Sequence, residues 1–380
     1  MKSSNATHYI TLALIVSVNL FVSLQKIHAQ ANSIRNNVTF NWADTQAVLS
    51  DPANLQSITI NGVDYNTFVV PSSYEMTRLG PGGDSQNNIW SNGSRIVDGS
   101  NSINWNTEAL NAYQSLNLNH YFQSDSTGEN FCGDYSALAT SNAQIQTIRY
   151  NPGIPSNPDG VIAITERGGN NCMYVELYGI PVGGGAEQLL GRTFVRNQGN
   201  LTGVRPQAPP TNNSDYWSSG RNNENNQIIG IALYELSELA PTGSIITSIR
   251  YMGATTDHGD GKFFLMQTYA EDDSLRIKLD REGNGDIAAN DLVPDGSTYS
   301  LLSSVSNGTL IFNPNGQFNY VPNPGFTGND TFEYQVCLPA PNTGVCDTGT
   351  CSIMGVLSSH LHVFIAEMLP KKTRQFSNWC

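Results

Sequence analysis

Charged residues are scarce in this chain of 380 residues, where Asp, Glu, Lys and Arg together make up 13%. Acidic residues outnumber basic ones by 32 to 19, which leaves a formal net charge of −13. The main body has no cluster of Lys or Arg that could overcome the repulsion between an acidic protein and a phosphate backbone. We therefore expect no nucleic-acid partner.

Motifs of catalysis and of zinc binding are also lacking. No serine lies in a GxSxG elbow, and His120 and His258 are isolated, so nothing indicates a hydrolytic triad. The run of three glycines at 183–185 lacks the Lys-Ser/Thr ending of a phosphate-binding loop. No Cys or His spacing predicts a zinc site. These absences favour a binding or structural protein over an enzyme.

The first 29 residues predict a secretory signal peptide. Lys2 supplies a positive charge, residues 9–24 form an apolar run, and Ala29 is a small residue at the expected cleavage point before Gln30. An uncleaved membrane anchor is the alternative, because the run approaches the length needed to span a bilayer. We expect a secreted, extracellular or cell-surface protein.

Six cysteines suit an oxidising destination. Cys337 and Cys346 flank a short loop rich in Pro, Asn and Gly, and we predict that they form a disulfide. Cys132 and Cys172 are the two cysteines of the preceding region and form the other candidate pair. The spacing alone does not determine the connectivity of six cysteines.

Short apolar, β-branched and aromatic runs, separated by Gly, Asn, Pro and Asp, predict an all-β protein. We expect an N-terminal β-sandwich of jelly-roll type over residues 32–268. One helix is expected at 107–116, where apolar residues share a face. The clearest predicted strands of this domain are 161–165, 173–178, 228–236 and 245–252, with a turn at Pro241-Thr242-Gly243 between the last two.

A second domain is predicted to begin near Tyr269. Leu275, Ile277 and Leu279 alternate with basic residues, and an alternating aromatic run follows at 332–336, as expected for strands with one buried face. Asn313-Pro314-Asn315-Gly316 predicts a hairpin turn, because Asn and Gly tolerate positive φ. These signals indicate a small compact sandwich over residues 269–353.

The second domain resembles the bacterial cadherin-like or immunoglobulin-like repeats of large surface proteins. The resemblance rests on AEDDS (270–274), GDIAANDLVPDGSTYSL (285–301), NGTLIFNPNGQFNYVPNPGFTGNDTFEYQVC (307–337) and the CLPAPNTGVCD loop. It implies an Ig/cadherin-like β-sandwich, a tandem-repeat adhesin type of protein, and, in some relatives, calcium at the junctions between domains. Residues 32–267 resemble more loosely the β-rich N-terminal regions of such proteins, which implies no activity.

The composition changes abruptly over residues 354–380, which contain two His and the basic cluster Lys371-Lys372-Arg374. A truncated or frame-shifted end and an amphipathic surface segment are both open interpretations of this atypical tail. The sequence therefore leaves open whether the second domain has a regular last strand.

The second domain also offers candidate ligands for a calcium ion, namely Asp272, Asp273, Asn290, Asp291 and Asp330. They occupy loop-like positions, and Ca²⁺ prefers oxygen ligands that converge from loops. Their role as ordinary turn formers is the alternative. The stretch 280–291 imitates an EF-hand loop, but a strand precedes it and an Asp replaces the final Glu, so we do not expect an EF-hand.

Two further groups are weighed in the first domain. Glu166 and Glu176 are candidates for the paired carboxylates of a glycosidase, but ordinary solvent-facing acids on strands are the preferred interpretation. Tyr216, Trp217 and Arg221 form a candidate platform for stacking on a glycan, with a Trp that closes the sandwich core as the alternative.

The sequence thus predicts an exported cell-surface or extracellular protein with a structural or adhesive role that acts by binding. Calcium is the candidate cofactor, and an extracellular protein or a glycan surface is the expected partner. The alternative is a carbohydrate-binding module or an accessory protein of glycan degradation. The sequence does not define the ligand or the oligomeric state.

Overall fold

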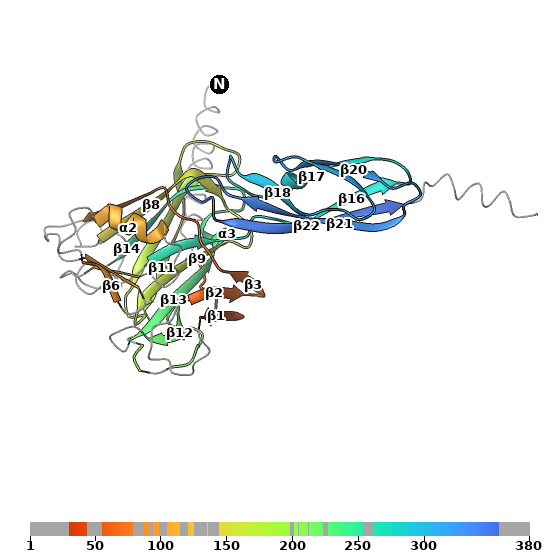
Figure 1. Ribbon diagram of the computed structural model, residues 1–380. Helices are drawn as coiled ribbons and strands as arrows, with labels where there is room; N and C mark the ends of the chain where they lie inside the picture. Colours follow the sequence, from red (N-terminus) through yellow and green to blue (C-terminus); the bar gives the residue numbers. More distant parts are fainter. Residues whose placement is uncertain are drawn as a thin grey trace, which may run out of the picture. The chain divides into compact units, whose positions relative to one another are not determined.

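The computed structural model describes residues 30–43, 55–78, 87–91, 94–98, 105–114, 121–124, 135, 144–197, 201–203, 205–211, 213–222, 227–253 and 262–356. Strands dominate these residues, which confirms the predicted all-β fold (Figure 1). The predicted signal peptide and the tail beyond Val356 lie outside them. Unit 1 comprises Met1–Thr268, Leu292–Asp295 and Pro339–Val345, and unit 2 comprises Tyr269–Asp291, Gly296–Leu338 and Cys346–Cys380.

Unit 1 is built around two antiparallel sheets with the strand orders β11-β10-β14-β8-β4 and β12-β13-β9-β15. It also contains the three-stranded sheets β1-β2-β3 and β6-β5-β7. The elements are β1 Val38–Trp42, β2 Leu55–Ile60, β3 Val63–Tyr65, β4 Ser73–Arg78, β5 Asn87–Ser91, β6 Ser94–Asp98, α2 Trp105–Gln114, β7 Tyr121–Ser124, β8 Gln144–Pro155, β9 Val161–Arg167, β10 Met173–Ile180, β11 Gln188–Val195, β12 Tyr216–Asn222, β13 Ile228–Glu235, α3 Leu236–Leu239, β14 Ile245–Gly253 and β15 Lys262–Met266.

The two main sheets of unit 1 pack against each other through aromatic side chains. The rings of Tyr251 on β14 and Phe263 on β15 are stacked, with centroids 5.1 Å apart. The hydroxyl of Tyr216 on β12 lies 3.6 Å from the sulfur of Met173 on β10. Side chains that interdigitate between two sheets define a β-sandwich, so the sandwich predicted for this region is confirmed.

The predicted strands of this region correspond to β9, β10, β13 and β14, and the predicted helix corresponds to α2. Ser244 N donates to Pro241 O at 2.9 Å, which closes the predicted turn before β14. However, β13 and β14 belong to different sheets. The turn therefore leads the chain from one sheet to the other and does not close a hairpin.

Unit 2 is a small sandwich with the sheet orders β16-β22-β21-β18 and β17-β20-β19. The first sheet is mixed, because β22 runs antiparallel to β21 but parallel to β16. The elements are β16 Asp273–Lys278, β17 Gly283–Asp286, the 3₁₀ helix η3 Ile287–Ala289, β18 Thr298–Ser303, β19 Gly308–Phe312, β20 Gln317–Pro322, β21 Gly328–Cys337 and β22 Cys346–Val356.

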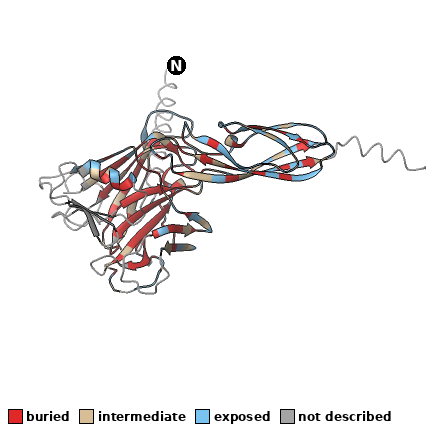
Figure 2. Cartoon of the chain, viewed as in Figure 1, coloured by how far each residue is buried: buried red, intermediate tan, exposed pale blue. Residues whose placement is uncertain are grey.

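Alternate side chains fill the core of unit 2, as the sequence pattern predicts. Phe332, Tyr334 and Val336 on β21 are fully buried. The ring of Phe332 meets that of Phe318 on β20 edge to face, with centroids 5.0 Å apart, and so joins the two sheets. Figure 2 shows buried residues alternating with exposed ones along these strands, whereas the central strands of unit 1 are buried almost throughout.

The predicted hairpin joins β19 to β20. Gly316 N donates to Asn313 O at 3.0 Å, and Asn313 N donates to Gln317 O at 2.9 Å. Of the Asn-Gly pair, only Gly316 adopts a positive φ, at 89°. The turn therefore needs its glycine, while Asn315 keeps an ordinary backbone conformation.

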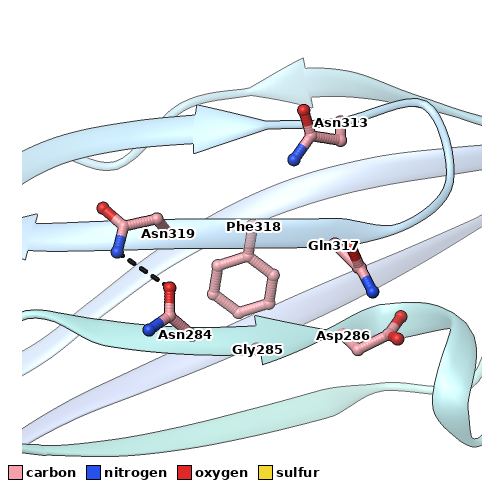
Figure 3. Close-up of a pocket in the computed structure, with 7 residues that line it drawn as sticks. All are labelled: Asn284, Gly285, Asp286, Asn313, Gln317, Phe318 and Asn319. Atoms are coloured by element: carbon pink, nitrogen blue, oxygen red, sulfur yellow. Dashed lines mark hydrogen bonds between the residues drawn. The ribbon is translucent and has the colours of Figure 1, made fainter.

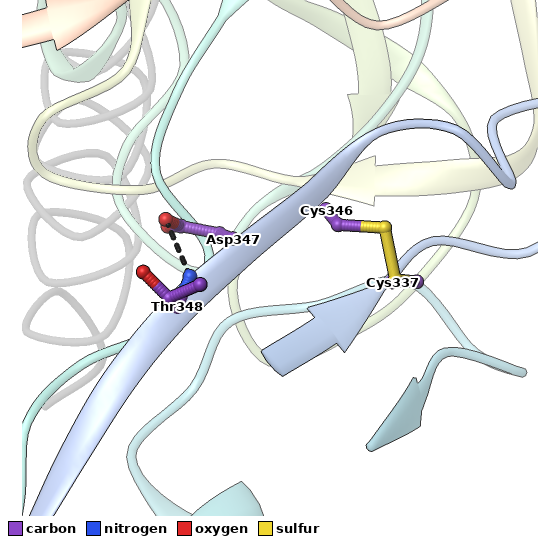
Figure 4. Close-up of a disulfide and its surroundings, with 4 residues drawn as sticks. All are labelled: Cys337, Cys346, Asp347 and Thr348. Carbon is purple, nitrogen blue, oxygen red and sulfur yellow. Dashed lines mark hydrogen bonds between the residues drawn. A yellow bond between two sulfur atoms is a disulfide. The ribbon is translucent and has the colours of Figure 1, made fainter. Parts of the chain in front are cut away.

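The predicted disulfide joins Cys337 to Cys346, which lie opposite each other at the ends of β21 and β22 (Figure 4). Cys172 is also disulfide-bonded. Because Cys132 lies outside the described residues, the predicted pairing of Cys172 with Cys132 stays a prediction. β22 settles the question of the last strand, because Cys346–Gly355 pairs with β21 and Cys351–Val356 pairs with β16.

Candidate functional site

Four of the five predicted calcium ligands gather around the start of β16. Asp272 and Asp273 stand there, and Asn290 and Asp291 follow η3. Asn290 Nδ2 lies 3.4 Å from Glu271 O and 3.3 Å from Asp272 O, and donates to both. Asp291 Oδ1 accepts a hydrogen bond from Glu271 N at 2.8 Å. These hydrogen bonds hold the two acidic segments side by side.

In this acidic cluster, the neighbouring charges that raise the pKa values of Asp273 and Asp291 are themselves carboxylates. Burial raises the pKa of Asp273 to about 6, and the charges of Asp291 and Asp272 act in the same direction. Burial also raises the pKa of Asp291 to about 6, helped by the charges of Glu271 and Asp347. A proton or a bound cation relieves such an excess of negative charge.

Asp330, the fifth predicted ligand, has a different environment. Its carboxylate accepts hydrogen bonds from Ser306 N at 2.9 Å, Asn307 N at 2.7 Å and the Tyr320 hydroxyl at 3.0 Å. Burial alone would raise the pKa of Asp330, but these hydrogen bonds outweigh burial and hold the pKa below its ordinary value. Asp330 therefore secures the backbone before β19 and does not join the other four.

No group of three or more His, Cys, Asp or Glu side chains within the described ranges is arranged to hold a metal ion. Two carboxyl groups with raised pKa values and one amide lie around β16, but they do not form a closed coordination shell.

The predicted aromatic platform of unit 1 is wrong, because its three side chains are buried. Tyr216 is 0% exposed, Trp217 is 5% exposed and Arg221 is 3% exposed. Trp217 Nε1 donates to Ile34 O at 2.7 Å, and its ring meets Phe40 edge to face. These rings fill the interior and have no face to offer a sugar, which agrees with the alternative of a core-closing Trp.

The two carboxylates weighed for glycosidase chemistry lie in different sheets, Glu166 on β9 and Glu176 on β10. Glu166 accepts a hydrogen bond from Asn170 N at 2.9 Å. Glu176 accepts one from Arg192 Nε at 2.6 Å and others from two tyrosine hydroxyls. Each carboxylate is thus held by its own partners within the fold.

The sequence analysis did not identify the buried carboxylate of Asp215 in unit 1. It accepts hydrogen bonds from Arg196 Nε at 2.9 Å and Arg196 Nη2 at 2.6 Å, and from Ser33 Oγ at 2.7 Å. Burial would raise the pKa of Asp215, but these donors outweigh burial and hold it below its ordinary value. The position before Tyr216 carries no local signal, because Ser33 lies 182 positions away.

Unit 2 also has a polar pocket that no sequence pattern indicates (Figure 3). Its lining residues are Asn284, Gly285, Asp286, Asn313, Gln317, Phe318 and Asn319, and its volume is about 530 Å³. A Cβ on Gly285 would lie 2.3 Å from the Phe318 ring, so a glycine is required for the ring to lie against β17. The stretch that imitates an EF-hand loop contributes part of this pocket as strand β17.

A comparison with known protein families identifies unit 2. Residues 267–354 match the family described as Bacterial Ig domain, which confirms the expected bacterial Ig-like repeat domain. Domains of this kind are typically non-catalytic and are commonly extracellular or surface-located. The chain matches no curated protein at a significant level. Within the part of the chain that the structure describes, no helix combines the length and apolar character needed to cross a membrane.

Proposed function

We propose that this chain is exported and serves outside the cell as a structural or adhesive protein that acts by binding. The bacterial Ig-like domain at residues 267–354 carries this proposal. The Cys337–Cys346 disulfide supports it, because disulfides persist in oxidising compartments. The signal peptide predicted at residues 1–29 would provide the route.

The buried acids of unit 1 support binding over catalysis. Asp215 and Glu176 are both buried and hydrogen-bonded to arginines. A carboxylate that is buried and paired in this way is not available to a substrate, and removal of its partner would destabilise the fold. Of the alternative functions, a carbohydrate-binding module would hold a polysaccharide without cleaving it, whereas a glycan-degrading accessory protein would contribute to its cleavage.

Export is tested by expressing the full chain from Met1 in a bacterial host with an oxidising periplasm. We expect the exported protein to begin at Gln30 and to resist alkylation at Cys337 and Cys346 until a reductant is added. Val16→Arg, which breaks the apolar run, should keep the chain in the cytosol. A cytosolic wild-type chain with reactive thiols at both positions would contradict the proposal.

Adhesion is tested with beads coated with the exported chain on surfaces of polysaccharide or extracellular matrix protein. We expect retention of the beads under flow and no release of reducing ends from the polysaccharide. Retention equal to that of albumin-coated beads would reject the adhesive role. Steady release of reducing ends would instead identify an enzyme.

Calcium is a second candidate, supported by the acidic cluster around β16. Asp273 and Asp291 have raised pKa values, as stated above. Asp291 is buried, and its pKa is raised even though hydrogen bonds from Glu271 N and from Tyr299 act to lower it. A hard divalent cation would supply the missing positive charge to these oxygens.

The calcium test uses thermal unfolding of the full chain in EDTA and in excess Ca²⁺ at pH 7. A ligand present at one hundred times its Kd stabilises the folded state by about 2.7 kcal/mol. The Asp273→Asn/Asp291→Asn double variant should lose this stabilisation, whereas Glu282→Gln, an exposed position in the EF-hand imitation, should retain it. An unchanged transition of the wild-type chain in Ca²⁺ would exclude calcium as cofactor.

A further inference from the structure

The outer face of β17 and β20 presents a compact block of polar side chains. Antiparallel pairing places Asn284 opposite Asn319 and Asp286 opposite Gln317. Residues two apart on a strand share a face, so all four point to the same side of the sheet. Asn284, Asp286 and Gln317 are exposed, and Asn319 is half-buried. The two cross-strand pairs form two adjacent rows along the pocket of Figure 3.

Hydrogen bonds hold part of this block in place. Asn319 Nδ2 donates to Asn284 Oδ1 at 2.9 Å, as the dashed line in Figure 3 shows. Asp286 Oδ1 accepts a hydrogen bond from Ala288 N at 3.1 Å at the start of η3. Side chains that are already fixed lose less conformational freedom when a ligand binds.

The chemistry of the block matches a hydroxylated ligand. Each carboxamide has two N–H donors and a carbonyl acceptor, so the Asn284–Asn319 hydrogen bond leaves donors and acceptors of both groups for a ligand. A sugar hydroxyl likewise donates and accepts. Among the seven lining residues the one charged group is the acid Asp286, so the pocket disfavours phosphate, sulfate and carboxylate ligands.

Aliphatic side chains lie beside the amides on the same face. Ile311 on β19 is opposite Asn319, and it is 58% exposed. Val321, two positions after Asn319 on β20, is 43% exposed. An exposed apolar surface next to hydrogen-bonding groups complements a pyranose ring, which combines C–H faces with equatorial hydroxyls. The pocket volume of about 530 Å³ lies within the range of about 300–1,000 Å³ found for small-ligand sites.

We propose that the β17-β20-β19 face of unit 2 binds a neutral glycan, with Asn284, Asn319 and Gln317 as hydrogen-bonding residues and Ile311 and Val321 as the apolar contact. The inference rests on the proposed function, because it names the ligand class for a protein that acts by binding outside the cell. The site is open on one face of a rigid sheet and therefore accepts a stretch of a longer polysaccharide.

The test measures binding of the full chain to neutral hexasaccharides of glucose, mannose and N-acetylglucosamine, with hexagalacturonate as the anionic comparison, by calorimetry and saturation-transfer NMR. We expect at least one neutral sugar to bind and hexagalacturonate to bind at least tenfold more weakly. Asn319→Ala and Asn284→Ala should each weaken the neutral sugar by roughly tenfold, which is the effect of about one hydrogen bond.

Asn329→Ala is the matched control, because Asn329 is also an exposed Asn of unit 2 but lies on β21 and outside the pocket. It should leave the affinity unchanged. Circular dichroism of each variant verifies that the sheets are intact.

Two results would overturn the inference. The first is that no neutral hexasaccharide binds at about 10 mM, a concentration that detects weak specific binding. The second is that Asn319→Ala and Asn284→Ala leave the affinity for the neutral sugar unchanged. The adhesion assay on matrix protein is independent of both. Bead retention there, with no sugar binding, would reject this site and leave the proposed function standing. If the beads were not retained but the neutral sugar still bound, the adhesive role would be rejected and this site would stand.

Discussion

Asp215 and Glu176 of unit 1 and Asp273 and Asp291 of unit 2 are acidic side chains in opposite environments. In unit 1, Asp215 and Glu176 are buried against arginines, and the pKa of Asp215 lies below its ordinary value. In unit 2, burial raises the pKa values of Asp273 and Asp291 to about 6, and the charges of neighbouring carboxylates act in the same direction. The hydrogen bonds to Asp215 stabilise its charged form in the fold, as those to Asp330 do in unit 2. Asp273 and Asp291 are instead kept at a cost in stability, which is characteristic of functional sites.

The amide side chains show the same difference. In unit 1, Gln207 hydrogen-bonds both Phe40 N and Phe40 O, and so extends the backbone hydrogen bonding beside β1. In unit 2, Asn284 and Asn319 hydrogen-bond each other on an exposed face and keep further donors and acceptors for solvent. We conclude that unit 1 uses its polar groups internally, whereas unit 2 displays them.

The largest expected effect concerns the small core of unit 2. Phe332→Ala removes a fully buried ring that contacts Phe312 and Phe318, and such a truncation costs about 3–5 kcal/mol. Hydrogen exchange of the full chain should show β21 and β22 amides exchanging much faster. Leu302→Ala, at a position 53% exposed, is the control and should change little. Unchanged exchange in Phe332→Ala would mean that this ring is not central to the sandwich.

A smaller effect is expected when the internal charge of unit 1 is removed. Asp215→Asn keeps the shape of the side chain but loses the charged hydrogen bonds to Arg196 and Ser33, at a cost of about 2 kcal/mol. The amides of β12 should exchange faster. Glu187→Gln, an exposed position, should leave them unchanged. If the β12 amides exchanged equally fast in Asp215→Asn and in the wild type, the difference between the acids of unit 1 and those of unit 2 would not hold.

The smallest effect is the pH dependence of unit 2. The folded pKa values of Asp273 and Asp291 lie near 6, above the ordinary 3.8, so between these limits the folded state binds more protons than the unfolded state. The free energy of unfolding should therefore rise as the pH falls from 7 to 5. Because solvent screens the half-buried Asp273, the free energy of unfolding should rise by only about 1 kcal/mol.

Hydrogen exchange of β16 and β22 amides at pH 7 and pH 5, corrected for intrinsic rates, measures this change. The Asp273→Asn/Asp291→Asn double variant should flatten the dependence. A wild-type unit 2 that loses stability over the same interval would show that other groups dominate and would remove the contrast with unit 1.

Local signals made several features predictable. Asn313-Pro314-Asn315-Gly316 determines its own turn, because Gly316 is the residue that adopts a positive φ. Cys337 and Cys346 are close in sequence, so their pairing needed no knowledge of the fold. The aromatic alternation on β21 located the core of unit 2 in the same way.

Features that depend on distant partners were not predictable. The sequence left open whether Trp217 forms a glycan platform or closes the core, because the partner of its indole, Ile34, lies 183 positions earlier in the chain. Asp330 looked like a metal ligand because an acidic residue next to Gly and Asn has the same sequence signature whether it binds an ion from a loop or, as on β21, accepts hydrogen bonds from backbone N–H groups. The amide block was missed because it exists only once β17 and β20 pair in register.

The parallel pairing of β16 with β22 has a mechanical consequence. The chain starts β16 at Asp273, opposite Cys351, and finishes β22 at Val356, opposite Lys278. Because the strands rise about 3.3 Å per residue, five steps separate the incoming and outgoing ends of unit 2 by about 17 Å along the strands. Tension applied through these ends would load all the hydrogen bonds between β16 and β22 in shear at once and would not break them one by one. Such a connection suits a protein that must hold under pulling.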